Sequence, residues 1–134
     1  MRLIAAVISA VFATGQVWAH SDEFLATKVT PHGGQQKMSG AYHLELVVNE
    51  SQITVYITDH GDVAQPTRGW SGSATLLSAG RKHKVALKPG AHNMLEGKAP
   101  SPPAPGAKLV ISVTDAQKQR EQARFELPSP KPAN

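Results

Sequence analysis

The chain contains no cysteine among its 134 residues. This absence excludes disulfide bonds, thiolate nucleophiles, and zinc or iron–sulfur sites that depend on cysteine. A metal site would have to use His, Met, Asp, Glu or the terminal amine. Aromatic side chains are scarce, and lysines and arginines are scattered among acids. With few rings to stack on bases and no basic stripe to follow a phosphate backbone, nucleic acid is not an expected partner.

Long apolar runs are also missing after the first nineteen residues, MRLIAAVISAVFATGQVWA. These residues 1–19 have the pattern of a secretory signal peptide: Arg2 precedes an apolar stretch, and Val17 and Ala19 occupy the −3 and −1 positions of a cleavage site. The apolar stretch is shorter than the about 20 residues that a spanning helix needs. We therefore expect a periplasmic protein with no membrane span that begins at His20. Cleavage removes one arginine and no acid, which lowers the formal net charge from +4 to +3.

Apolar and polar residues alternate in two consecutive stretches, 41–48 and 53–58, which are joined by a short polar link. Such alternation predicts two strands that each bury one face, and the link predicts a β-hairpin. The apolar face of the hairpin is the expected core. Further short strands are expected at 73–77, 82–87, 93–96, 108–114 and 122–127. About seven strands and no helix after the signal peptide predict an all-β fold, an antiparallel β-sandwich of Ig-like or similar Greek-key topology.

The flanking segments are polar and rich in turn-forming residues. We expect a flexible arm over 20–38, the β-sandwich domain over 39–127 and a disordered tail over 128–134, where prolines alternate with other residues. Prolines at 100, 102, 103 and 105 exclude a central strand there and indicate a stiff loop. The domain therefore has to hold itself together through its own core.

Histidines are the best candidates for chemistry in a chain without cysteine. If Asn49 pairs with Gln52, the hairpin register places His43 opposite Thr58 and makes His60 its diagonal neighbour on the outward, polar face. Diagonal neighbours lie about 7–8 Å apart, which allows two imidazoles to share a metal ion. A register shift of one residue would separate them.

Several other residues are weaker candidate ligands. Asp62 follows His60 closely and could bind a metal or orient a histidine, although the same segment is typical of a simple turn. His92 and Met94 would suit Cu(I), but a histidine that caps a loop and a methionine that fills the core are the better explanation of these two residues. His20, once it is terminal, could chelate a metal through its amine and its imidazole.

The remaining signals are weaker still. His32 and Met38 fall in the expected arm, and His83 stands in a cationic stretch that is typical of solvated surface. There is no Gly-x-Ser-x-Gly nucleophile elbow, and no carboxylate pair is framed by apolar residues that would raise one pKa. We therefore expect no catalytic residues, no organic cofactor and no enzymatic activity.

Residues 40–47 (GAYHLELV) and 55–60 (VYITDH) resemble small periplasmic proteins associated with bacterial heavy-metal, notably copper, resistance and efflux systems. Residues 72–75, 87–89 and 122–125 agree with the same pattern. The resemblance implies a periplasmic accessory or metal-binding role, and only His43 and His60 carry over as ligands. A looser similarity, to exported copper carriers with an N-terminal histidine, lacks their Met-rich segments.

The sequence thus predicts an exported, non-catalytic protein that binds or handles a transition metal. Copper is the first expectation, with zinc or nickel as other possible ions, and an envelope efflux or resistance protein is a possible partner. The alternative prediction is an interaction module that docks on an envelope complex, with incidental histidines.

Overall fold

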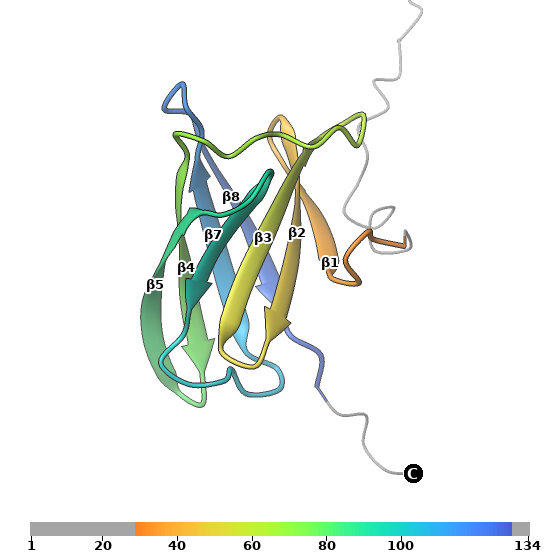
Figure 1. The fold of residues 1–134 in the computed structure, drawn as a ribbon. Helices are drawn as coiled ribbons and strands as arrows, with labels where there is room; N and C mark the ends of the chain where they lie inside the picture. Colours follow the sequence, from red (N-terminus) through yellow and green to blue (C-terminus); the bar gives the residue numbers. More distant parts are fainter. Residues whose placement is uncertain (1–28, 130–134) are drawn as a thin grey trace, which may run out of the picture.

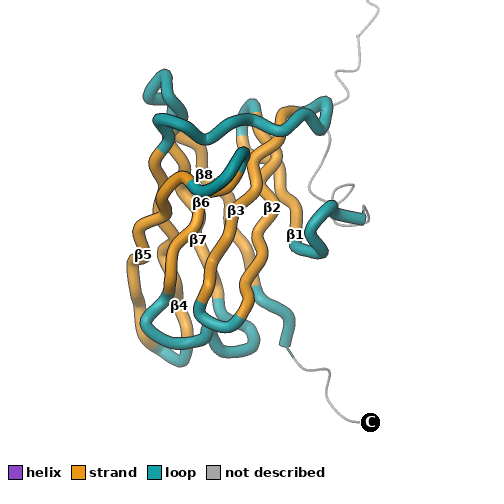
Figure 2. Tube along the Cα trace, viewed as in Figure 1, coloured by secondary structure: helices purple, strands orange, loops and turns teal. Residues whose placement is uncertain are grey.

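The structure is a computed structural model in which residues 29–129 are described. The expected signal peptide, residues 20–28 of the expected arm with His20, and residues 130–134 lie outside the described residues. The described chain is built from eight strands joined by turns and loops (Figures 1 and 2). They are β1 (Gln35–Ser39), β2 (Tyr42–Asn49), β3 (Gln52–Asp59), β4 (Ser71–Ser78), β5 (Arg81–Pro89), β6 (Met94–Lys98), β7 (Lys108–Thr114) and β8 (Arg120–Glu126). Within 29–129 no helix is long and apolar enough to cross a membrane.

All eight strands belong to one antiparallel sheet with the order β1-β2-β3-β6-β5-β4-β7-β8. The prediction of an all-β antiparallel fold is confirmed. The expectation of about seven strands in a two-sheet sandwich is corrected. β5 also pairs with β6, and this pairing joins the two halves of the sheet, β1-β2-β3-β6 and β5-β4-β7-β8. This pairing covers only two residue pairs, Lys88 with Glu96 and Pro89 with Leu95.

The two edge strands, β1 and β8, lie beside each other, so the sheet is nearly closed and barrel-like. They are linked by side chains that donate to backbone carbonyls. Gln35 Nε2 donates to the Glu126 carbonyl at 2.9 Å, and Ser39 Oγ donates to the Gln122 carbonyl at 2.6 Å. These bonds occupy backbone acceptors that an edge strand would otherwise leave unpaired.

The interior is filled by the apolar side chains of both halves of the sheet. The apolar face expected for the first hairpin is confirmed: Leu44, Ile53 and Ile57 are fully buried, and Tyr42 and Val48 pack at the margin. Burial of one such aliphatic side chain stabilises a fold by about 1.5–3 kcal/mol. The core residues are Leu44, Leu46, Ile53, Val55, Ile57, Trp70, Ala74, Leu76, Val85, Leu87, Leu95, Ala99, Ala107, Leu109, Ile111, Val113, Ala123 and Phe125.

The β2–β3 hairpin has the expected register. Asn49 pairs with Gln52, and His43 pairs with Thr58. Glu50, in the two-residue link, has a φ of 53°, the left-handed conformation that tight hairpin turns use. The register places His43 and the start of the loop after β3 at the same end of the hairpin.

The expected arm, 20–38, is corrected at its C-terminal end, where β1 begins at Gln35. This strand pairs with β2 along its whole length, with Gln36 opposite Glu45 and Met38 opposite His43. Its residues are polar apart from Met38, so alternation of hydrophobicity did not reveal it. Pairing with the exposed edge of β2 is what makes the segment a strand.

Candidate metal centre

His43 and His60 meet at the end of the β2–β3 hairpin. His60 Nδ1 lies 3.1 Å from His43 Nε2, and the two rings are nearly perpendicular, at 86°. His43 projects from β2 and is fully buried, whereas His60, the first residue after β3, is exposed. The proximity expected from the hairpin register is therefore present, and one imidazole of the pair is open to solvent.

The outer nitrogens of the two rings each face an oxygen. His60 Nε2 donates to the Gly40 carbonyl at 2.8 Å, in the turn between β1 and β2. His43 Nδ1 lies 3.5 Å from Asp62 Oδ1, within ion-pair distance. The Gly40 carbonyl can only accept, so His60 Nε2 carries a proton, and in the neutral ring His60 Nδ1 presents its lone pair to His43 Nε2.

The loop after β3 is organised by Asp59. Its Oδ1 accepts hydrogen bonds from the backbone N–H groups of Gly61 and Val63, at 2.8 and 2.9 Å. Asp62 has a φ of 61°, and its N–H donates to the Asp59 carbonyl at 3.0 Å. Asp59 therefore stabilises a turn, as the sequence of this segment suggested. The same turn brings Asp62 to His43, so the segment can be a turn and Asp62 can still orient a histidine.

The outward face of β2 is polar, as expected, but it is covered. Glu45 is only 3% exposed, and His43 on the same face is fully buried. The cover comes from two segments outside the hairpin: the turn at 30–34 packs over Glu45, and the loop after β3 packs over His43. Alternation within a strand identifies its two faces but does not indicate whether another segment covers the polar one.

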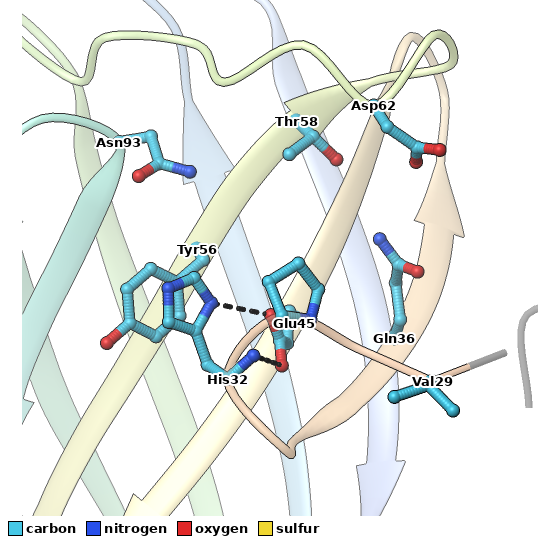
Figure 3. A pocket seen from close by; sticks show the side chains of 9 residues that line it. Val29, His32, Gln36, Glu45, Tyr56, Thr58, Asp62 and Asn93 are labelled. Carbon is cyan, nitrogen blue, oxygen red and sulfur yellow. Dashed lines mark hydrogen bonds and ion pairs between the residues drawn. The ribbon is translucent and has the colours of Figure 1, made fainter.

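His32 and Glu45 form a second cluster that the sequence did not identify. Glu45 Oε1 accepts from His32 Nδ1 at 2.8 Å, and Oε2 accepts from the backbone N–H groups of His32 and Gly34 at 3.1 and 2.9 Å. The His32 ring also stacks on Tyr56, with centroids 3.5 Å apart (Figure 3). The three donors satisfy a carboxylate that would be costly to bury alone. The available signal was the PHGG turn, followed by Glu45 on the polar face of β2.

A cavity of about 150 Å³ lies between this cluster and the loop after β3 (Figure 3). Its lining includes His32, Glu45, Tyr56, Thr58 and Asp62. Thr58 Oγ1 is buried and has no hydrogen-bond partner in the structure. One water molecule needs only about 10–15 Å³ of cavity volume, so the cavity has room for several waters next to Asp62.

His92 and Met94 are placed differently from the histidine pair. His92 is exposed in a turn with a φ of 52°, and its carbonyl accepts from the N–H and the hydroxyl of Thr67. Met94 begins β6 and pairs with Tyr56, on the side of β3 away from β2. Two strand spacings amount to roughly 10 Å, so this register does not bring Met94 to His43.

Among residues 29–129 no group of three or more His, Asp or Glu side chains is arranged to hold a metal ion. The histidine pair therefore brings two ring nitrogens to within 3.1 Å of each other, and Asp62 lies near the other nitrogen of His43. Comparison of the chain with protein-family models, with curated proteins and with solved structures found no match.

Proposed function

We propose that this protein is an exported, non-catalytic transition-metal-binding protein whose central ligands are His43 Nε2 and His60 Nδ1. The observation that carries the proposal is the 3.1 Å approach of these two nitrogens. Two nitrogens bound to one metal by bonds of about 2.0–2.1 Å lie about 2.9 Å apart at a right angle and about 3.4 Å apart in a tetrahedron. The spacing in the protein lies within this interval.

The surroundings of the pair support the same proposal. In the neutral ring of His60 the proton on Nε2 points to the Gly40 carbonyl, so Nδ1 presents its lone pair toward His43 Nε2. A metal ion that replaces the N–H···N hydrogen bond would take up this lone pair together with that of His43 Nε2. The Asp62 carboxylate, 3.5 Å from His43 Nδ1, would then orient the His43 ring as metal-bound histidines commonly are.

The donor set restricts the class of metal. Imidazole nitrogen suits copper, zinc and nickel, and is a poor ligand for hard cations such as Mg²⁺ and Ca²⁺. Copper is the first expectation because of the resemblance to periplasmic heavy-metal resistance proteins. Export to the periplasm rests on the pattern of residues 1–19 and stays a prediction, as does a partner in an envelope efflux or resistance complex.

Metal titration of the purified protein tests the proposal. We expect Cu(II) and Zn(II) to bind with one-to-one stoichiometry at the pair, and His60→Ala and the His43→Ala/His60→Ala double variant to lose this binding. His83→Ala is the matched control and should bind as the wild type does. His20→Ala, measured in parallel, separates binding at the chain terminus from binding at the pair.

Circular dichroism and thermal unfolding should show that His60→Ala remains folded, since His60 is exposed. Wild-type protein that binds neither metal, or binding that survives in a folded double variant, would contradict the proposal. The interaction module with incidental histidines would then be the better interpretation.

A further inference from the structure

Met38 lies directly across from His43 in the β1–β2 ladder. Paired residues in antiparallel strands project from the same face of the sheet, so Met38 shares the outward face with His43. It is half-buried. Directly opposed residues have Cβ atoms about 4.5–5.5 Å apart, well within the reach of an unbranched thioether side chain.

His60 reaches the same end of β1 by a separate contact. Its Nε2 donates to the carbonyl of Gly40, which lies two residues after Met38 in the turn between β1 and β2. His60 thus contacts both His43 on β2 and the turn between β1 and β2. The pairing register and this hydrogen bond independently bring two imidazoles and one thioether to one corner of the sheet.

Asp62 is not the natural third ligand of this corner. Its carboxylate faces Nδ1 of His43, on the other side of the ring from the nitrogen that faces His60. The part of the chain from 29 to 129 offers no third His, Asp or Glu arranged for a metal. Thioether sulfur is a soft ligand that favours Cu(I), and it adds little for Zn(II) or Ni(II).

We propose that Met38 is the third protein ligand, and that the His43–His60–Met38 corner selects reduced copper, Cu(I), over divalent ions. This inference rests on the proposed function of the histidine pair. Binding of Cu(I) involves no change in oxidation state at the site, since the ion arrives reduced and exchanges its previous ligands for two nitrogens and one sulfur.

The experiment compares Met38→Leu with Met94→Leu. Leucine keeps the apolar bulk of either methionine and removes only the sulfur. Met94 is the matched control, because it is also half-buried on the outward face but lies beyond β3. Cu(I) affinity is measured without oxygen by competition with a chromophoric Cu(I) chelator, and Zn(II) affinity is measured on the same proteins by competition with a zinc indicator.

We expect Met38→Leu to weaken Cu(I) binding by at least about tenfold, the lower end of what loss of even an outer-shell partner costs a metal site. Zn(II) binding should stay within twofold of the wild type, and Met94→Leu should change neither affinity. X-ray absorption of the Cu(I) protein should show a sulfur neighbour that disappears in Met38→Leu. Circular dichroism would show whether Met38→Leu has unfolded and for that reason binds neither metal. In that case the Cu(I) affinity of Met38→Gln and the sulfur signal of the wild-type protein decide whether Met38 is a ligand.

Two negative outcomes are distinguishable. If Zn(II) and Cu(I) bind through the histidines but Met38→Leu leaves Cu(I) affinity unchanged and the copper has no sulfur neighbour, the Met38 ligand is wrong while the histidine site stands. If the wild type binds neither ion, both proposals fail.

Discussion

Glu45 and His32 are joined at both carboxylate oxygens. The imidazole Nδ1 of His32 donates to Oε1 at 2.8 Å, and the backbone N–H of the same residue donates to Oε2 at 3.1 Å. The Glu45 side chain is only 4% exposed. A single buried acid on β2 thus fixes the turn at 30–34 against the sheet. Pro31 and His32 of this turn line the cavity that Asp62 borders from the loop after β3.

Replacement of this acid should loosen the turn. Glu45→Gln keeps one oxygen as an acceptor but loses the charge-assisted bond to His32 and leaves an amide group opposite backbone donors. We expect the free energy of unfolding to fall by about 1.5–3 kcal/mol, the range for a hydrogen bond to a charged group. Urea denaturation of the wild type and the variant measures this difference.

His32→Ala is the companion variant. It removes the imidazole and its stacking on Tyr56 but leaves two backbone N–H donors for Glu45. The free energy of unfolding should therefore fall by less in His32→Ala than in Glu45→Gln. If the free energy of unfolding of Glu45→Gln differs from that of the wild type by no more than about 0.5 kcal/mol, as for an ordinary surface substitution, this carboxylate does not hold the turn.

Asp62→Asn should weaken metal binding without unfolding the protein. The substitution removes the charge that faces His43 Nδ1, while Asn tolerates the left-handed φ of 61° at this position. Outer-shell substitutions of this kind cost about 10–100-fold in metal affinity, and the half-exposed position of Asp62 favours the lower end. Competition titration with Cu(I) and Zn(II) provides the measurement.

Asp59→Asn is the matched control for this prediction. It removes an equal charge three residues away, and its side-chain oxygen can still accept from the N–H groups of Gly61 and Val63. The loop then loses only the longer bond of 3.3 Å that Gln65 Nε2 donates to Oδ2. Equal losses in Asp59→Asn and Asp62→Asn would indicate a general electrostatic effect of the loop. Orientation of His43 by Asp62 would then be excluded.

The hairpin and the proximity of its two histidines could be predicted because both depend on local features. The alternation of residues 42–48 and 53–58 and a two-residue link determine which residues face each other, and the pairing of His43 with Thr58 follows. His43 is in contact with His60 and Asp62 of the loop after β3, and Glu45 is in contact with the turn at 30–34. Both segments lie outside β2, so no pattern within this strand could indicate the burial of these two side chains.

The strand β1 and the closure of the sheet escaped prediction for a related reason. Residues 35–39 carry no apolar alternation, and they become a strand through the free edge of β2 and through hydrogen bonds from Gln35 and Ser39 to β8. The junction of the two halves rests on two residue pairs between β5 and β6. Without β1, the position of Met38 beside His43 could not be anticipated.

Asp115 should make stability depend on pH at acid values. Its Oδ1 accepts from the N–H groups of Gln119 and Gln117, and its Oδ2 from the hydroxyl of Tyr42 at 2.9 Å. The bond from Gln119, with those from Tyr42 and Gln117, holds the pKa of Asp115 below its ordinary value of 3.8, against the opposing effect of burial. A lowered pKa in the folded state stabilises the fold above pH 3.8, and this contribution is lost as the pH falls through the folded-state pKa.

The comparison of wild type with Asp115→Asn isolates this contribution. The difference between their free energies of unfolding should be constant near neutral pH and shrink below about pH 3.8, because the protonated acid and the amide then carry no charge. Tyr42→Phe removes one of the three donors and should show a shallower decline than the wild type. Urea unfolding of the three proteins between pH 2 and pH 7 gives the measurement, and a difference that does not change across this range would mean that the turn is not stabilised by the charge of Asp115.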